Sequence, residues 1–178
     1  STNVFVFDPK NIITSSQQYR LFKGTNDITQ GIHQLFEIVL KRNNLYKESA
    51  NVDEVVAMFE EIFVVITSID DLLGAYDDKT NEMLELILEK GKSVYKINIL
   101  IASTAKNIGS LSYSRWFKEN ANSQNVIWYG SGLADQYIFD LNNKGSDLYV
   151  QLPNMFGFVV QNGNYTKVKF ITQKSENK

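Results

Sequence analysis

Apolar runs and amphipathic stretches alternate along the first two thirds of the chain. Three short runs rich in Val, Ile or Phe stand at residues 4–7, 62–66 and 97–102. Runs with so few polar positions predict strands of a parallel sheet that are buried on both faces. Residues 26–39 and 77–91 repeat apolar side chains at helical spacing, which predicts two amphipathic helices between these strands. Strands and helices in this order indicate an α/β domain.

Short local signals predict where the helices begin and end. Asp27 with Gln30 forms a capping-box pattern, so the first long helix is expected to begin at residue 26 or 27. Asn51 with Glu54 forms a second capping box, which predicts the start of a short helix. Gly91 is the expected C-cap of the second long helix.

The last third of the chain differs from the rest because most of its predicted elements are β-strands. We predict helices at residues 112–120 and 133–141, and strands at residues 125–129, 147–152, 156–161 and 166–172. Asn162-Gly163 is a strong signal for a tight turn between the last two strands. The prediction is a three-layer domain with a mostly parallel sheet, helices on both faces and a C-terminal β-hairpin, ending in a frayed tail at residues 175–178.

Composition limits the class of protein. The chain has 178 residues, 43% of them hydrophobic and 21% charged, which indicates one globular domain. The absence of cysteine excludes a disulfide framework, a thiolate metal site and a cysteine nucleophile. A net charge of −2 provides no overall attraction for nucleic acid, and no apolar run approaches the ~20 residues of a membrane helix. Because Ser1 leads almost directly into a strand, we expect a fragment of a longer protein.

Polar residues follow the central strand directly. Thr67 and Ser68 come first, and Asp70 and Asp71 come next. Open α/β sheets bind ligands at the carboxyl ends of their strands, so these four residues are candidate site residues. Neither hydroxyl can act as a general base at neutral pH. The two acids could coordinate a divalent cation, but with no third acid nearby in sequence they equally fit a solvated cap of the segment.

Aromatic residues crowd the region after the third strand. Those that could line a groove for an amphipathic helix are Tyr113, Trp116, Phe117, Trp128 and Tyr129. Aromatic side chains at such density equally fit a hydrophobic core. His33 is the only histidine, so the sequence offers no cluster of histidine ligands for a metal.

The order of these segments resembles the FtsK/SpoIIIE-type motor ATPase domain, from just after its phosphate-binding loop to its end. Val-Phe-Asp-Pro-Lys at residues 6–10 is similar to the family's I-D-P-K strand end. The other segments that carry the resemblance are Leu40-Lys41-Arg42 with Tyr46, residues 63–72, residues 97–104, and the closing hairpin at residues 145–171 with Gly163 in its turn.

The departures from the family pattern fall on its catalytic positions. The metal-binding Asp of the family corresponds to Thr67, its catalytic Glu to Ser68, and its strand-end Gln to Thr104, while Asp71 retains a later Asp. The phosphate-binding loop has no counterpart in the chain. The resemblance therefore implies no catalytic residue, and a vestigial nucleotide or metal site formed by Asp8, Lys10, Asp70, Asp71 and Thr104.

A domain altered in this way is most similar to the last, degenerate ATPase domain of the EssC/EccC proteins of type VII secretion systems. The resemblance implies one RecA-like domain at residues 1–174, with no cofactor of its own, and with ATP and Mg²⁺ in neighbouring domains of the parent chain. It further implies secreted helical-hairpin proteins as substrates, the neighbouring ATPase domains as partners, and a hexamer as a possible assembly. It places the domain at the cytoplasmic face of the cell membrane, attached only through another region.

Three functions stay open at this point. The first is a catalytically silent domain that recognises secretion substrates or regulates its neighbour. The second is an active ATPase whose phosphate loop lies upstream, with Asp8 or Asp70 serving the metal. The third is a DNA translocase, for which the scattered Lys and Arg residues give no basic track. Arg115 could act as an arginine finger on a neighbouring subunit, or simply be a surface arginine.

Overall fold

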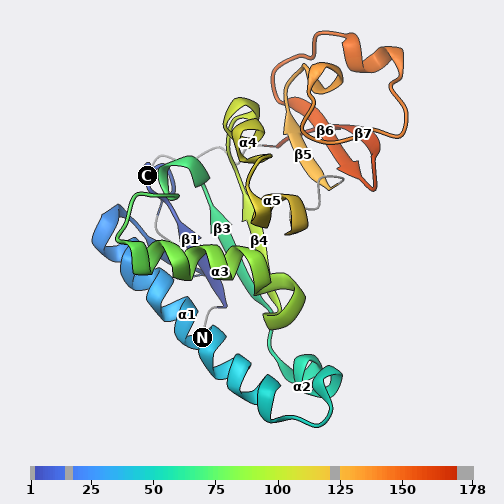
Figure 1. Cartoon of the computed structure of the whole chain (residues 1–178). Coiled ribbons are helices and arrows are strands. Elements are labelled where there is room, and N and C mark those ends of the chain that lie inside the picture. Colours follow the sequence, from blue (N-terminus) through green and yellow to red (C-terminus); the bar gives the residue numbers. More distant parts are fainter. Residues whose placement is uncertain (1–2, 15–17, 121–124, 172–178) are drawn as a thin grey trace. The chain divides into compact units, whose positions relative to one another are not determined.

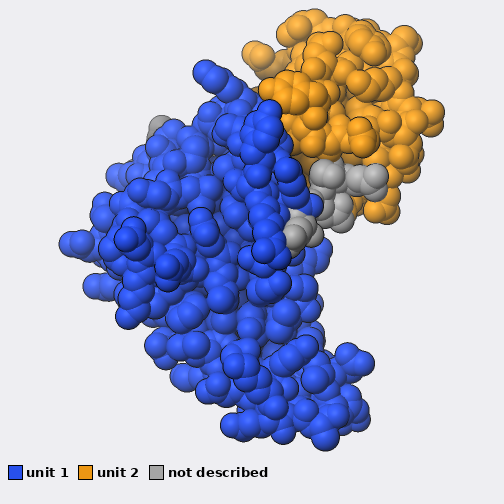
Figure 2. Space-filling model, in the orientation of Figure 1, with its two compact units in different colours: residues 1–120 blue, residues 121–178 orange. Residues whose placement is uncertain are grey.

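The structure is a computed structural model that describes residues 3–14, 18–120 and 125–171 (Figure 1). The chain divides into two compact units, Ser1–Asn120 and Ala121–Lys178, which Figure 2 shows in different colours. Each unit has its own hydrophobic core. The tail predicted to fray at residues 175–178 lies outside the described residues. Among the described helices, none combines the length and the apolar character needed to cross a membrane.

Unit 1 contains a parallel sheet of four strands in the order β2-β1-β3-β4. These strands are β1 (Val4–Phe7), β2 (Arg20–Phe22), β3 (Ile62–Ile66) and β4 (Ile97–Ile101). β3 pairs in parallel with both β1 and β4, so all four strands have their carboxyl ends at one edge. The predicted parallel α/β sheet is confirmed, and β2 is a strand that was not predicted.

The described part of unit 1 also contains five α-helices and a 3-10 helix at Ile69–Asp71. The α-helices are α1 (Gly24–Glu48), α2 (Val52–Met58), α3 (Asp78–Tyr95), α4 (Ala105–Leu111) and α5 (Arg115–Asn120). α1 and α3 pack against each other over one face of the sheet (Figure 1). α1 approaches the sheet closely because Gly31 has no side chain: a Cβ there would lie 2.6 Å from the Phe7 ring and 2.8 Å from the Phe22 ring.

The second face of the sheet is more open than predicted. Phe63 on β3 is 46% exposed, and Leu100 on β4 is 56% exposed. Both lie on the face opposite to the buried Ile62, Val64 and Ile66, because side chains alternate along a strand. The prediction of a central strand buried on both faces is therefore wrong for Phe63.

Two predicted helix ends are wrong. α1 begins at Gly24, after an N-cap residue, Lys23, whose side chain makes no capping hydrogen bond. Asp27 lies inside the first turn, where a negative charge suits the helix dipole, so it is no N-cap. α3 passes through Gly91 and ends at Tyr95, with Lys96 as its left-handed C-cap. Gly91 is needed for packing, since a Cβ there would lie 3.3 Å from Cβ of Ile97.

Other local predictions are confirmed or refined. The side chain of Asn51 accepts a hydrogen bond from the backbone N–H of Glu54 and caps α2, as the capping box predicts. Asp77 caps α3 in the same way through the N–H of Thr80, at 3.0 Å. The helix predicted at residues 112–120 begins only at Arg115, and α4 was not predicted.

Unit 2 is built on a three-stranded antiparallel sheet of β5 (Val126–Tyr129), β6 (Phe156–Gln161) and β7 (Asn164–Lys169). The turn between β6 and β7 is at Asn162 and Gly163, with φ values of 51° and 76°. Positive φ at both positions is what a tight two-residue hairpin turn requires. The predicted hairpin is therefore confirmed.

Two further predictions in unit 2 are wrong. The predicted helix at residues 133–141 is only a 3-10 turn at Leu133–Asp135, and the predicted strand at 147–152 contains a 3-10 turn at Ser146–Tyr149. The side-chain oxygen of Gln136 accepts hydrogen bonds from the N–H groups of Ile138 and Phe139, which ends the helical pattern there. The apolar residues of these segments instead pack into the hydrophobic core of unit 2. They are Leu133, Phe139, Leu148 and Leu152.

Candidate functional site at the carboxyl edge of the parallel sheet

The segments that follow β1, β3 and β4 meet at the carboxyl edge of the parallel sheet. Hydrogen bonds and one ion pair join their polar side chains into two groups. Asp8 and Thr67 form the first, and Lys10, Ser68, Asp70, Asp71, Ser103 and Asn107 form the second. The structure therefore brings Asp8, Lys10, Thr67, Ser68, Asp70 and Asp71 to this edge, whereas the predicted Thr104 belongs to neither group.

Asp8 is fully buried, and protein groups bind both of its carboxylate oxygens. Oδ2 accepts a hydrogen bond from the N–H of Ile13 at 2.7 Å, and Oδ1 accepts one from the hydroxyl of Thr67 at 2.9 Å. Burial alone would raise the pKa of Asp8, but the hydrogen bonds from Ile13, Ile12 and Thr67 outweigh it and hold the pKa below its ordinary value. Thr67 thus serves as a hydrogen-bond donor to Asp8.

Asp70 joins the segment after β3 to the segment after β4. Its Oδ1 accepts a hydrogen bond from the hydroxyl of Ser103 at 3.0 Å, and its Oδ2 accepts one from the side-chain amide of Asn107 at 2.8 Å. Burial raises the pKa of Asp70, and these donors together with its own backbone N–H lower it further than burial raises it. Thr104 caps α4 by accepting a hydrogen bond from the N–H of Asn107 at 3.3 Å, which is a structural role.

Asp71 is held by two donors on one oxygen. The hydroxyl of Ser68 donates to Oδ2, and Nζ of Lys10 lies 2.9 Å from the same atom. The hydrogen bond from Ser68 and the ammonium group of Lys10 both lower the pKa of Asp71, so this carboxylate stays ionised at neutral pH. Ser68 therefore orients Asp71 and carries no basic group.

Protein donors contact all three carboxylates of this arrangement. Divalent cations such as Mg²⁺ take several oxygen ligands. Both oxygens of Asp8 and of Asp70 accept hydrogen bonds, whereas the two donors to Asp71 share its Oδ2. Within the described parts of the chain, no group of three or more His, Cys, Asp or Glu residues could hold a metal ion.

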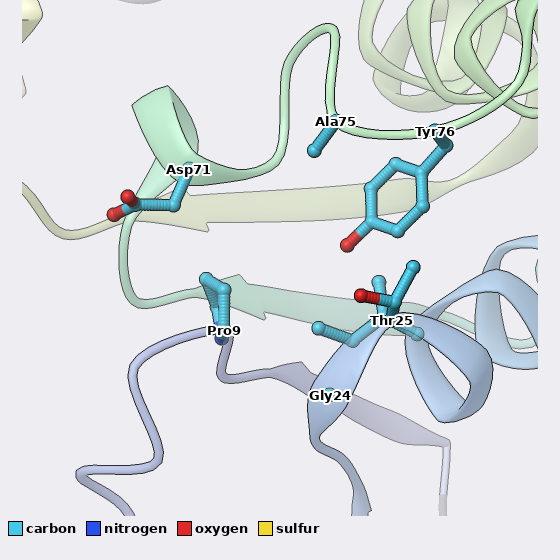
Figure 3. Close-up of a pocket in the computed structure, with 7 residues that line it drawn as sticks. Pro9, Gly24, Thr25, Asp71, Ala75 and Tyr76 are labelled. Carbon is cyan, nitrogen blue, oxygen red and sulfur yellow. The ribbon is translucent and has the colours of Figure 1, made fainter.

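A pocket of about 180 Å³ opens at the same edge of the sheet (Figure 3). Its lining comes from the loop after β1, the first turns of α1 and the segment after β3, and consists of Pro9, Gly24, Thr25, Ile28, Asp71, Ala75 and Tyr76. Asp71 is shared between the pocket and the hydrogen-bonded cluster. The pocket is therefore part of the same candidate site.

Arg115 lies at the start of α5. Its guanidinium nitrogen Nη2 is 3.9 Å from Glu89 on α3, and its side chain is largely exposed. This contact fits the surface role that the sequence left open. His33 on α1 contacts the hydroxyl of Thr80, with 3.2 Å between Nε2 and Oγ1, and so links α1 to α3.

The five candidate groove aromatics are divided between the two units. Trp116 and Phe117 make an edge-to-face contact at 5.6 Å and belong to the core of unit 1. Trp128 packs against the core of unit 2. Tyr113 is 86% exposed in unit 1 and Tyr129 is 64% exposed in unit 2. The two tryptophans therefore have the core role that the sequence offered as the alternative.

Sequence reasoning missed Ser103 and Asn107 in the hydrogen-bonded cluster, and every residue of the pocket lining except Asp71. Ser103 lies two residues after Ile101, the last residue of β4, so the rule of strand ends could have found it. Asn107 was missed because α4 was not predicted. No sequence pattern marked Thr25 and Tyr76 as site residues, because their place in the pocket depends on how α1 and the segment after β3 meet in space.

Comparisons with solved structures define the class of fold. No protein-family model and no curated protein matches the chain. The cytoplasmic domain of EssC superposes with a TM-score of 0.67 and 13% identity, over 94% of this chain and 33% of that one. EssC ATPases 2 and 3 from Geobacillus thermodenitrificans superpose with a TM-score of 0.68 and 13% identity, over 94% and 30% of the two chains. The described chain therefore has an ATPase-domain fold.

A third solved structure has a similar fold. It is Thermomonospora curvata EccC, ATPases 2 and 3, in complex with a signal sequence peptide, with a TM-score of 0.67 and 15% identity. The match covers 97% of this chain and 31% of the EccC chain. This chain therefore spans about a third of the length of each of these three solved chains. The fold is that of an EssC/EccC-like ATPase domain.

Proposed function

We propose that this chain is a catalytically silent ATPase-like domain of a type VII protein secretion motor, and that it serves as a docking or regulatory module for secreted substrates. The observation that carries the proposal is the strand-end cluster. Its carboxylates bind hydroxyl, amide and ammonium groups of the same chain, and hydroxyl side chains stand at the two family positions that need acids.

Hydrolysis of a nucleotide by this class of fold needs three parts. A phosphate cradle, a carboxylate for the metal and a residue that orients water must all be present. The chain has no counterpart of the cradle sequence, and Thr67 and Ser68 replace the other two. We therefore expect no cofactor in this domain, with ATP and Mg²⁺ bound by neighbouring ATPase domains of the parent chain.

The likeness to EccC in complex with a signal sequence peptide supports the choice of partner. We propose a secreted helical-hairpin protein with a peptide signal as the substrate of the parent protein, and the neighbouring ATPase domains as its other partners. A parent hexamer at the cytoplasmic face of the membrane completes this proposal. The acidic balance of the chain is compatible with a protein cargo rather than DNA.

The experiment is a test of Asp70, the acid that an active site would need most. ATP turnover by the parent protein is measured before and after Asp70→Ala, with titration of this domain by Mg·ATP as a second readout. We expect unchanged turnover per folded protein and no saturable heat. Loss of turnover in Asp70→Ala, together with saturable Mg·ATP binding to the domain, would establish an active ATPase instead.

A further inference from the structure

One face of the antiparallel sheet in unit 2 is apolar and exposed. Side chains alternate along a strand, so the register of the sheet places four apolar residues on the same side, namely Ile127, Tyr129, Val159 and Val168. Ile127 and Tyr129 are each 64% exposed, and the two valines are half-buried. Phe158 is fully buried on the opposite side, in the core of unit 2. We call the side that carries the four residues the outer face.

An aromatic pair extends the apolar surface of the outer face. The ring centroids of Tyr129 and Phe170 lie 5.4 Å apart. Gly157 stands opposite Tyr129 and leaves room for the second ring, since a Cβ at Gly157 would lie 2.8 Å from the Phe170 ring. The apolar side chains of the outer face are therefore contiguous across β5, β6 and β7.

The charges of β7 lie on the core side of the sheet instead of the outer face. An antiparallel sheet with one face in water normally places its polar side chains on that face. Lys167 and Lys169 instead point to the core side, where their ammonium groups lie 5.4 and 5.9 Å from the centroid of the Phe156 ring. No charged residue of β5, β6 or β7 is on the outer face. Its polar residues in these strands are uncharged and gather towards the hairpin turn, namely Gln161, Asn164 and Thr166.

The dimensions of the outer face determine which kind of element can cover it. Neighbouring strands lie about 4.8 Å apart, and residues two positions apart on a strand lie about 6.8 Å apart, so the apolar part measures roughly 10 by 15 Å. Two such faces in a symmetric dimer would bury far less than the ~1,200 Å² of a stable, specific interface. One α-helix is about 10 Å wide, and about three turns of it match the length.

We propose that the outer face of unit 2 docks an amphipathic α-helix of a partner protein, about three turns long, whose apolar side carries no charge. Ile127 and Tyr129 make the main contacts because they are the most exposed, and the contact with Phe170 holds the Tyr129 ring in place. The inference rests on the proposed docking of helical substrates and assigns it to one surface of the chain. Because no ion pair contributes, the affinity is expected to be nearly independent of salt concentration.

Nuclear magnetic resonance titration of the 178-residue chain with two model peptides tests this proposal. Both peptides contain the same numbers of Leu and Gln and are held helical by a covalent staple. In the striped peptide the leucines recur at helical spacing and form one apolar side, and in the scrambled peptide they do not. We expect the striped peptide to shift the amide signals of Ile127, Tyr129, Val159 and Val168 in a saturable way, equally at about 0.05 M and about 0.5 M salt. The scrambled peptide is expected to bind at least roughly 10-fold more weakly.

Two matched substitutions locate the binding. Ile127→Thr removes apolar surface from the outer face, and Val150→Thr removes it from a position that is 58% exposed and lies outside the sheet. Threonine is β-branched and suits extended backbone, so both variants are expected to fold. We expect Ile127→Thr to weaken binding of the striped peptide roughly 5- to 20-fold and Val150→Thr to leave it unchanged.

Several outcomes would overturn the proposal. They are an absence of saturable shifts, saturable shifts away from the outer face, equal binding of the scrambled peptide, and equal affinities of the two variants. The same titration with a helical-hairpin substrate separates this site from the proposed function. A substrate that binds without shifting the outer-face signals would overturn this site alone. A substrate that fails to bind, while the striped peptide binds the outer face, would overturn the docking function alone.

Discussion

Asp8 is buried and nevertheless ionised, because three hydrogen-bond donors compensate for its lost hydration. Its pKa is lower in the folded chain than in the unfolded chain, so the folded state binds a proton less readily. The stability that Asp8 contributes is therefore complete above about pH 5 and is lost as the pH falls through the lowered pKa. Asp70, Asp71 and Asp77, whose pKa values are also lowered, add to the same trend.

A prediction for Asp8→Asn follows. The free energy of unfolding of the native chain should decrease between about pH 6 and pH 3, and this decrease should be smaller in Asp8→Asn because one linked carboxyl is gone. Urea unfolding at a series of pH values measures both curves. Parallel curves for the two proteins would contradict the assignment of Asp8 as a depressed-pKa group.

Arg42 is a buried cation that bonds backbone carbonyls instead of a carboxylate. Its guanidinium donates to the carbonyls of Tyr95 and Glu60 and lies over the ring of Phe59, 5.0 Å from its centroid. These contacts join α1 to the end of α3 and to the segment between α2 and β3. Arg42 therefore has a structural role in unit 1.

Arg42→Met should lower the free energy of unfolding by roughly 2–4 kcal/mol, because two buried carbonyls lose a charged donor. Lys41→Met, at the exposed neighbouring position, is the control and should change it by less than about 0.5 kcal/mol. If both substitutions lowered the free energy of unfolding equally in chemical denaturation, the buried contacts of Arg42 would not stabilise the fold.

At the scale of elements, the spacing between α1 and the sheet depends on Gly31. Alanine normally stabilises a helix relative to glycine by up to about 1 kcal/mol. At this position a methyl group would meet the rings of Phe7 and Phe22, so we expect Gly31→Ala to destabilise the chain by roughly 1–3 kcal/mol. The exposed α1 residue Gln34, changed to Ala, provides the comparison in thermal unfolding. A rise in stability in Gly31→Ala would refute this close packing.

Elements with a strong repeating pattern were predictable from the sequence, and those held by single contacts were not. The β1, β3 and β4 runs and the Asn162-Gly163 turn follow from local residue types. The segment at 133–141 was mistaken for a helix because its apolar residues imitate helical spacing, while Gln136 redirects its backbone. At the site, the strand-end residues Thr67, Ser68, Asp70 and Asp71 could be predicted, but their hydrogen-bond partners across strands depend on the tertiary fold.

Because the chain has two separate hydrophobic cores, we expect unit 1 and unit 2 to lose their structure independently. Phe158 is fully buried in the core of unit 2, and its replacement by Ala should cost roughly 3–5 kcal/mol within that unit. Hydrogen exchange should therefore quicken in β5, β6 and β7 of Phe158→Ala, while α1 and α3 keep their protection. Equal loss of protection in both units would mean that the chain unfolds as a single cooperative body.

We propose that this ATPase fold serves recognition rather than hydrolysis. The most direct measurement is a calorimetric titration of the chain with a small helical-hairpin secretion substrate, with and without its C-terminal tail, in the absence and presence of Mg·ATP. We expect saturable binding that requires the tail and is unchanged by Mg·ATP. No binding of the tailed substrate, or binding that needs hydrolysable ATP, would contradict it.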